Sequence, residues 1–288
     1  MNDLLPDVTF VITTYKRHEA LANCLASIRD MYSASKVIIV NDDPTDENLV
    51  FNDLNVHYSK NLKNLGCPKS RNIGASFVDT PFIFFLDDDA TIGNVDIAKA
   101  RDLLRENSSM VVCGFPARNH VGDAIYLTGF FDTASGSKEP FFDTPAFNGG
   151  ACLVRTNFFL PRGYHPRIHG YGEEAELTLR AIASGLRVVA LKNGGAIDHF
   201  PTLAARDVNL AKQRKNDVVT AFEYGGLLLG QRQFAAHAVA SIKMRSVHQV
   251  LGCFLGLLSG LKVINFSNRK RKMAYRKWLH LSRVSAIS

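Results

Sequence analysis

The stretch Pro81-Phe-Ile-Phe-Phe-Leu-Asp-Asp-Asp-Ala90 decides how this sequence is expected to fold. Its apolar and aromatic part favours a buried strand. Three adjacent carboxylates repel one another, so they need a cation or hydrogen-bond donors nearby. In an extended backbone Asp87 and Asp89 point to the same side and can share a ligand, whereas Asp88 points away. Carboxylate oxygens suit Mg²⁺ or Mn²⁺, and a solvated acidic turn is the plainer alternative.

Strands and helices alternate around this stretch. We expect strands over residues 8–14, 36–41 and 55–59, a helix with Leu21, Leu25 and Ile28 on one face, and a helix over 68–78. Such alternation favours right-handed crossovers between parallel strands. Polar clusters follow the strand ends, where open sheets of this kind bind ligands. The sequence therefore predicts an α/β fold, with a mostly parallel sheet flanked by helices and one site at its edge.

The charge is unevenly distributed along the 288 residues. The formal net charge is +7, yet residues 224–288 contain 11 Lys and Arg and no acidic residue. The rest of the chain holds 23 basic and 27 acidic residues, so the whole positive excess belongs to the C-terminal part. The five cysteines are scattered and show no metal or disulfide spacing, which is typical of reduced thiols in a cytosolic protein. No secretory signal is visible at the N-terminus.

Several polar residues near the strand ends are candidates for binding a nucleotide. Thr13 and Tyr15 suit stacking on a base or hydrogen bonding to it, or are ordinary strand-end residues. Asp43 offers an acceptor for a uracil or thymine N–H or for a ribose hydroxyl, or forms a turn or helix cap. Arg71 suits diphosphate oxygens, or is the partner in a surface salt bridge.

Six segments, taken in order, resemble glycosyltransferase family 2. They are Val11-Ile-Thr-Thr-Tyr-Lys-Arg17, Val40-Asn-Asp-Asp-Pro-Thr-Asp46, Lys69-Ser-Arg-Asn-Ile-Gly74, Phe85-Leu-Asp-Asp-Asp-Ala90, Asn148-Gly-Gly-Ala151 and Gly172-Glu-Glu-Ala-Glu-Leu-Thr-Leu-Arg180. The resemblance covers roughly residues 8–205 and implies the GT-A fold. It also implies transfer of a sugar, with inversion, from a nucleotide diphosphate sugar. Pro44 and Thr45 stand where the family more often has Gly and Ser.

The resemblance also implies roles for individual residues. The nucleotide-sugar-binding set would be Thr13, Tyr15, Arg17, Asp43, Arg71, Asp87, Asp88, Gly149 and Gly150. A DXD motif would hold Mn²⁺ or Mg²⁺ through Asp89 and Asp87, completed by His199, although a lone histidine is more often structural. Glu174, preceded by Glu173, would be the catalytic base. Without the resemblance, this pair reads as an acidic first helical turn that complements the helix dipole.

The C-terminal part differs in character from the rest. Apolar residues recur there at helical spacing among basic ones, and residues 250–261 form an uncharged run of 12 residues. A membrane-spanning helix needs about 20 apolar residues, so this run is too short to cross a bilayer. We expect residues 1–205 to be a GT-A domain and 206–288 a helical extension lying on an anionic membrane surface. A buried helical hairpin is the alternative, and no nucleic-acid-reading module is present.

Together these features predict a metal-dependent inverting hexosyl- or deoxyhexosyltransferase. Its donor would be a UDP- or dTDP-sugar and its acceptor a glycan or lipid-linked hydroxyl. The expected setting is bacterial surface polysaccharide biosynthesis, in the cytoplasm and peripheral on the inner face of the membrane. A haloacid-dehalogenase-type phosphatase is a weaker reading of Asp87-x-Asp89-x-Thr91, because the acidic pair at 42–43 lies upstream of it. A non-catalytic sugar-nucleotide-binding subunit is the other alternative.

Overall fold

The computed structural model describes residues 5–46, 55–121, 124–128, 139–168, 170–201, 206–264 and 269–287. The chain divides into two compact units. The first consists of Met1–Gly163 and Arg187–Pro201, and the second of Tyr164–Leu186 and Thr202–Ser288. The domain border predicted between residues 205 and 206 touches residues 202–205, which lie outside the described part, and it stays a prediction. By its contacts, segment 164–186 groups with the C-terminal helices.

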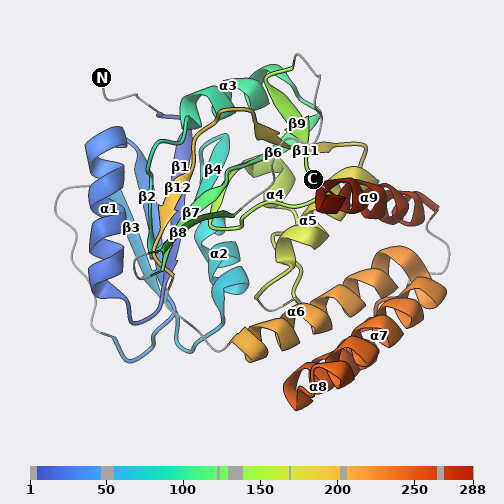
Figure 1. The fold of residues 1–288 in the computed structure, drawn as a ribbon. Coiled ribbons are helices and arrows are strands. Elements are labelled where there is room, and N and C mark those ends of the chain that lie inside the picture. The colour runs from blue at the N-terminus through green and yellow to red at the C-terminus, as the bar shows by residue number, and fades with distance from the viewer. Residues whose placement is uncertain are drawn as a thin grey trace. The chain divides into compact units, whose positions relative to one another are not determined.

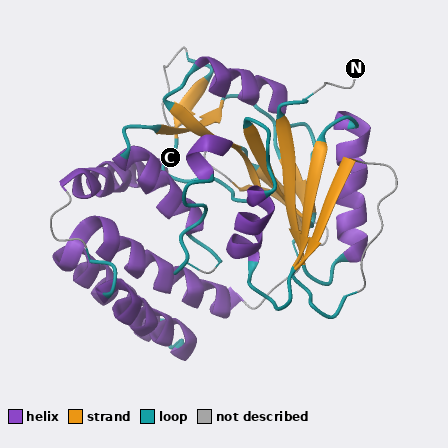
Figure 2. Cartoon of the chain, turned by 180° about the vertical axis from the view of Figure 1, so that it is seen from behind, coloured by secondary structure: helices purple, strands orange, loops and turns teal. Residues whose placement is uncertain are grey.

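The first unit contains an eight-stranded sheet. In spatial order its strands are β3 (Asn55–Lys60), β2 (Lys36–Asn41), β1 (Val8–Thr14), β4 (Phe82–Asp87), β10 (Ala151–Arg155), β6 (Met110–Gly114), β11 (Arg187–Leu191) and β9 (Phe141–Asp143). The first four are parallel, and β10 runs antiparallel to both of its neighbours. The strands stand out in orange in Figure 2. The predicted α/β class with a mostly parallel sheet is confirmed.

Helices cover both faces of this sheet because its central strands are apolar on both sides (Figure 1). On one face α1 (His18–Tyr32) and α3 (Ile97–Glu106) share a core with Phe10 and Phe84. On the other lie α2 (Cys67–Ser76) and the short α4 (Thr156–Phe159). Helix α2 comes close because Gly74 faces Val11, where an added Cβ would lie 2.6 Å from a Val11 methyl carbon. This packing fixes the start of α2 near the strand ends.

A second, smaller sheet lies beside the end of β4. Its order is β5 (Ala90–Thr91), β12 (Ile197–His199), β7 (Ala117–Val121) and β8 (Ala124–Thr128). Strand β12 pairs antiparallel with β5, so that His199 lies opposite Ala90. The backbone N–H of Phe200 also donates to the carbonyl of Asp89 at 2.8 Å. This pairing brings His199 next to the triple aspartate, 110 residues away in sequence.

The second unit is helical throughout its regular elements. It contains α5 (Glu173–Ala183), α6 (Arg206–Thr220), the π-helix η1 (Ala221–Gly225), α7 (Gly226–Lys243), α8 (Val247–Leu261) and α9 (Arg269–Ile287). The predicted helical C-terminal part is therefore confirmed. Among the described helices, none combines the length and the apolarity needed to cross a membrane.

Buried polar groups hold the π-helix between α5 and α9. Glu223, on η1, lies 3.1 Å from Arg271 Nη1 of α9 and 3.2 Å from His165 Nε2. Tyr224 donates its hydroxyl to Glu176 Oε1 of α5 at 2.7 Å. Because charged groups are costly to bury without partners, these contacts fix how α5, η1 and α9 pack on one another.

Candidate active site

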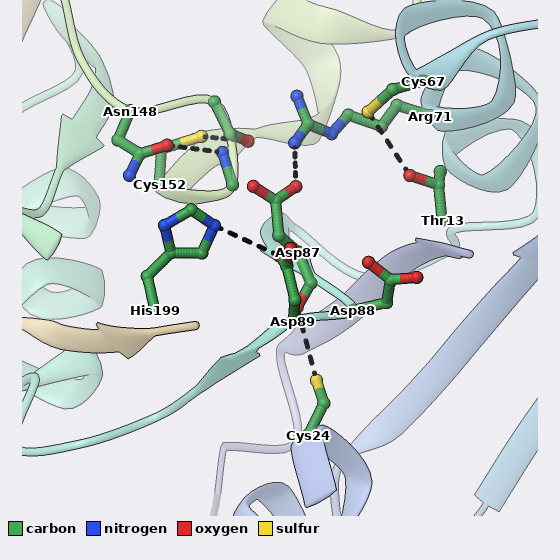
Figure 3. Close-up of polar contacts among 12 residues, drawn as sticks. Thr13, Cys24, Cys67, Arg71, Asp87, Asp88, Asp89, Asn148, Cys152 and His199 are labelled. Carbon is green, nitrogen blue, oxygen red and sulfur yellow. Dashed lines mark hydrogen bonds and ion pairs between the residues drawn. The ribbon is translucent and has the colours of Figure 1, made fainter. Parts of the chain in front are cut away.

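The three aspartates lie where β4 ends and β5 begins (Figure 3). Asp87, Asp89 and His199 each offer a ligand atom, and these three atoms lie within 4.8 Å of one another. Asp88 points away from His199, as the alternation of an extended backbone leads one to expect. Two carboxylate oxygens and one imidazole nitrogen therefore surround one common point.

The tautomer of His199 is set by Asn119 of β7. His199 Nδ1 lies 2.8 Å from Asn119 Oδ1, and the Asn119 amide nitrogen donates to the carbonyl of Ala117 at 3.2 Å. Since the amide oxygen of Asn119 and the carboxylate of Asp89 can only accept, His199 donates from Nδ1 to Asn119 and, when protonated, from Nε2 to Asp89 Oδ1 at 3.1 Å. Burial lowers the pKa of His199, but the hydrogen bond and charge of Asp89 outweigh it and raise that pKa.

Arg17 neutralises part of the carboxylate cluster. Its Nη1 donates to Asp88 Oδ1 at 3.0 Å and to Asp89 Oδ2 at 2.6 Å. Burial raises the pKa of Asp88 to about 6, against the lowering effects of Thr14 and Arg17. Arg17 is the residue just before α1, so its contacts with Asp88 and Asp89 connect the start of that helix to the end of β4.

Arg71 and Gly150 hold the carboxylate of Asp87 between them. Arg71 Nη2 donates to Asp87 Oδ1 at 2.6 Å, and its side chain is only 4% exposed. Arg71 is therefore buried while its partner Asp87 is 30% exposed, so the pair differs from the surface salt bridge that the sequence left open as an alternative. A Cβ at Gly150 would overlap the Asp87 carboxylate, so a glycine is needed there. Asn148 Oδ1 accepts from the backbone of Gly150 at 3.1 Å and holds that turn in place.

The residues predicted to bind the base lie at the ends of β1 and β2. Thr13 Oγ1 lies 3.3 Å from Cys67 Sγ at the start of α2, and Tyr15 is 43% exposed. Asp43 accepts from the backbone N–H and the hydroxyl of Thr45 at 3.0 and 2.7 Å, which lowers the pKa of its carboxyl. The structure thus shows the turn-forming role of Asp43, and its contact with a nucleotide stays a prediction.

Asp42 is a positioning residue that the sequence did not single out. Its carboxylate accepts from the backbone N–H groups of Leu65 and Gly66 at 2.8 and 2.7 Å, and from the amide of Asn61 at 2.9 Å. These bonds hold the loop that leads into α2 and therefore place Arg71. The position of Asp42 next to Asp43 could have indicated its role from the sequence, whereas nothing in the sequence pointed to Asn119.

Glu173 and Glu174 open α5, directly after Gly172 at φ 92°. Glu173 is buried and Glu174 is partly exposed. Both belong to the second unit, whereas the aspartate cluster and His199 belong to the first. The role of Glu174 as catalytic base stays a prediction.

Comparison with known proteins identifies the family. Residues 9–164, more than half of the chain, match the sequence profile of Glycosyl transferase family 2. The chain belongs to this family, which confirms the resemblance and does not favour the phosphatase alternative.

The matches with individual relatives cover very different shares of those proteins. The teichoic acid poly(glycerol phosphate) polymerase of Staphylococcus epidermidis is 33% identical over an alignment of 98 residues, and the match covers 31% of this chain and 14% of that protein. This chain therefore spans a small part of that relative. The crystal structure of S. aureus TarS residues 1–349 with UDP-GlcNAc has a TM-score of 0.61 at 15% identity, covering 96% of this chain and 91% of that one. The same TarS fragment with UDP gives a TM-score of 0.55 at 15% identity, over 94% and 91%. These likenesses show the fold.

The residues at the end of β4 fit a divalent cation. Asp87, Asp89 and His199 converge on one point, and because Asn119 accepts from Nδ1 of His199, Nε2 is the ring nitrogen that would exchange its proton for a metal. Two carboxylates with one imidazole suit Mn²⁺, and carboxylates suit Mg²⁺ as well. The buried Arg71 and the half-exposed Arg17 would remain as fixed positive charges beside such an ion.

Proposed function

We propose that this chain is a metal-dependent inverting glycosyltransferase that moves a hexosyl or deoxyhexosyl group from a UDP- or dTDP-sugar to an acceptor hydroxyl. The convergence of Asp87, Asp89 and His199 at a strand end, in a chain of this family, is the observation that carries the proposal. The complexes of TarS with UDP and UDP-GlcNAc support a uridine nucleotide as donor.

In this proposal each end of the donor meets a different part of the first unit. Thr13, Tyr15 and Asp43 would contact the base and ribose at the ends of β1 and β2. Arg17, Asp88 and the turn at Gly149 and Gly150 would lie beside the diphosphate and sugar. A bound Mn²⁺ or Mg²⁺ would supply positive charge to the leaving diphosphate.

Side chains of this chain would position the metal ligands and would take one proton from the acceptor. Arg71 holds Asp87 in place, and Asn119 orients His199, so the ligand atoms are positioned before any ion arrives. Glu174 would take the proton from the acceptor hydroxyl as that oxygen attacks the anomeric carbon, which inverts the configuration. Glu173, its buried neighbour, would support the start of α5.

The acceptor we propose is a hydroxyl of a cell-surface glycan or of a lipid-linked precursor. The relative named as a teichoic acid polymerase supports a surface polymer of that class. We place the reaction in the cytoplasm, at the inner face of the membrane, because lipid-linked precursors would be met there.

Two substitutions test the reaction and separate its parts. Manganese-dependent hydrolysis or transfer is measured over a panel of nucleotide sugars. We expect Asp89→Asn to lower turnover at least about 100-fold, with little change in melting temperature, because one ligand charge is lost. We expect Glu174→Gln to keep donor affinity but to lower transfer by about 100- to 10,000-fold.

Matched controls decide the assignment. Glu173→Gln should be less impaired than Glu174→Gln, and the reverse would make Glu173 the catalytic base. A wild-type protein that binds donor but never turns it over would favour the non-catalytic binding subunit. Full activity in excess chelator would rule out the metal.

A further inference from the structure

Helix α8 carries a stripe of large apolar side chains that face solvent. The α8 stripe consists of Val247, Leu251, Phe254, Leu255, Leu258 and Leu261. Their exposed fractions lie between 45% and 80%. Spacings of three and four residues put them on one side of the helix. Contiguous exposure of this kind marks a contact surface rather than ordinary surface variation.

The opposite side of α8 explains why the stripe faces outward. Gly252, Gly256 and Gly260 are buried there and lie against α6 and η1. A Cβ at Gly256 would lie 2.7 Å from the carbonyl oxygen of Lys215, and at Gly252 it would overlap that of Ala211. No leucine fits in such a gap, so rotating α8 to hide its large side chains would force α6 and α8 apart.

Polar contacts hold α8 in this rotation. Gln249, about one helical turn before Gly252, is buried and accepts from Arg214 Nε of α6 at 2.7 Å. Ser246 caps the helix by accepting from the backbone of Gln249 at 3.1 Å. The outward direction of the α8 stripe is therefore built into the packing of the second unit.

The surroundings of the stripe are apolar and basic. Ile242 and Met244, at the end of α7, are 63% and 56% exposed and lie just before α8 in the chain. Lys243, Arg245 and Lys262 are exposed at the two ends of the helix. From residue 224 to 288 the sequence has 11 basic residues and no acidic one. An apolar strip with exposed cations at both of its ends complements a surface that is both apolar and negatively charged.

We propose that the α8 stripe lies in the interface of an anionic phospholipid bilayer, with Lys243, Arg245 and Lys262 on the headgroups. A helix of this length extends about 22 Å, short of the about 30 Å hydrocarbon core, and only one side is apolar and free, so it lies in the plane of the membrane. A second copy of the chain fits less well, because it would bring identical cations together. The proposal adds a partner surface to the proposed transfer, and its test does not depend on turnover.

The test is binding of the full chain to vesicles, measured by co-sedimentation. One set contains phosphatidylglycerol and phosphatidylcholine, and the other phosphatidylcholine alone. We expect binding to the anionic set at low salt, with release as salt rises. The triple variant Leu251→Ser, Phe254→Ser, Leu258→Ser should bind at least about tenfold more weakly, since its apolar area is removed.

A matched control removes exposed apolar residues elsewhere. Met31→Ser, Leu62→Ser and Leu160→Ser, combined, change side chains of the first unit that are 37%, 97% and 42% exposed. This variant should bind vesicles like the wild type, and circular dichroism should show both triple variants folded. Equal binding by the α8 variant and the wild type overturns the proposal. So does failure of the wild type to bind anionic vesicles.

Insertion is measured directly with a tryptophan on the stripe. The chain has a single Trp, at position 278, so Phe254→Trp with Trp278→Phe places the only indole on α8. Its emission should shift to the blue with anionic vesicles and be quenched by brominated acyl chains. A dimer on gel filtration that the α8 variant abolishes, without vesicle binding, would assign the stripe to a second copy and overturn the lipid proposal. Absence of donor turnover leaves the vesicle result intact and counts only against the proposed reaction.

Discussion

At the scale of single residues, the candidate site is a set of charged side chains held in place by hydrogen bonds and ion pairs to their neighbours. Arg71 fixes Asp87, Arg17 bridges Asp88 and Asp89, and Asn119 sets the proton of His199. A buried polar side chain costs little stability while its hydrogen bonds are made. Each such bond also limits where the oxygen or nitrogen of a candidate metal ligand can lie. The affinity of the site for a cation should thus depend on residues one contact away.

Asn119 allows a sharp test of this dependence. We expect Asn119→Ala to weaken Mn²⁺ binding by about 10- to 100-fold, because the imidazole loses the acceptor that fixes its tautomer. Titration calorimetry measures the change without any substrate. Asn119→Asp keeps an acceptor and should recover most of the affinity.

The control for this experiment is Asn107→Ala. Asn107 also donates to a backbone carbonyl, that of Leu103 at the end of α3, and takes no part in the carboxylate cluster. Its loss should leave Mn²⁺ binding unchanged. Unchanged binding in Asn119→Ala as well would show that His199 needs no orienting partner.

At the scale of elements, the close approach of α6 and α8 organises the second unit. In an isolated helix, replacing glycine by alanine stabilises by about 1 kcal/mol. At Gly252 the added methyl would overlap the carbonyl oxygen of Ala211, so the two helices must separate. We expect Gly252→Ala to destabilise the second unit by about 1–3 kcal/mol, seen as a lower melting temperature in the fluorescence of Trp278.

The matched control lies on the same helix. Leu255 is 45% exposed, so Leu255→Ala should change stability by less than about 0.5 kcal/mol. A melting temperature that rises in Gly252→Ala would mean that α8 does not pack on α6 through its glycines.

At the scale of the whole molecule, buried ionisable groups make stability depend on pH in the alkaline range. Burial raises the pKa of Cys113 from 9.0 to about 12, and that of Tyr275 from 10.0 to about 12. The unfolded chain ionises these groups at their ordinary pKa values, whereas the folded chain keeps them neutral. Their contribution is therefore complete below pH 9 and is lost as the pH rises toward 12.

The expected result is a urea midpoint that falls between pH 8 and pH 10.5. Cys113 alone should account for a loss on the order of 2 kcal/mol over that interval. Far-UV circular dichroism follows the unfolding, and Cys113→Ala should show a shallower decline than the wild type. Identical slopes in the two proteins would mean that the Cys113 thiol is not protected from ionisation by the fold.

The sequence by itself determined the features that are local along the chain. The strands that became β1, β2 and β4, the aspartates at the end of β4, and the basic helical C-terminal part all follow from short patterns of apolar, branched and charged residues. Such patterns act through neighbouring residues, so they can be recognised without knowing the fold. The family resemblance then linked them to a class of reaction.

Only the tertiary structure decided which distant residues meet and which faces are left uncovered. The contact of His199 with Asn119 joins residues 80 apart and needs β12 to pair with β7. The grouping of Glu174 with the C-terminal helices and the outward turn of the α8 stripe depend likewise on packing across the chain. Periodicity shows that a helix has an apolar side. Whether that side is buried depends on which neighbour fits, and for α8 the small glycines fit α6 while the large side chains do not.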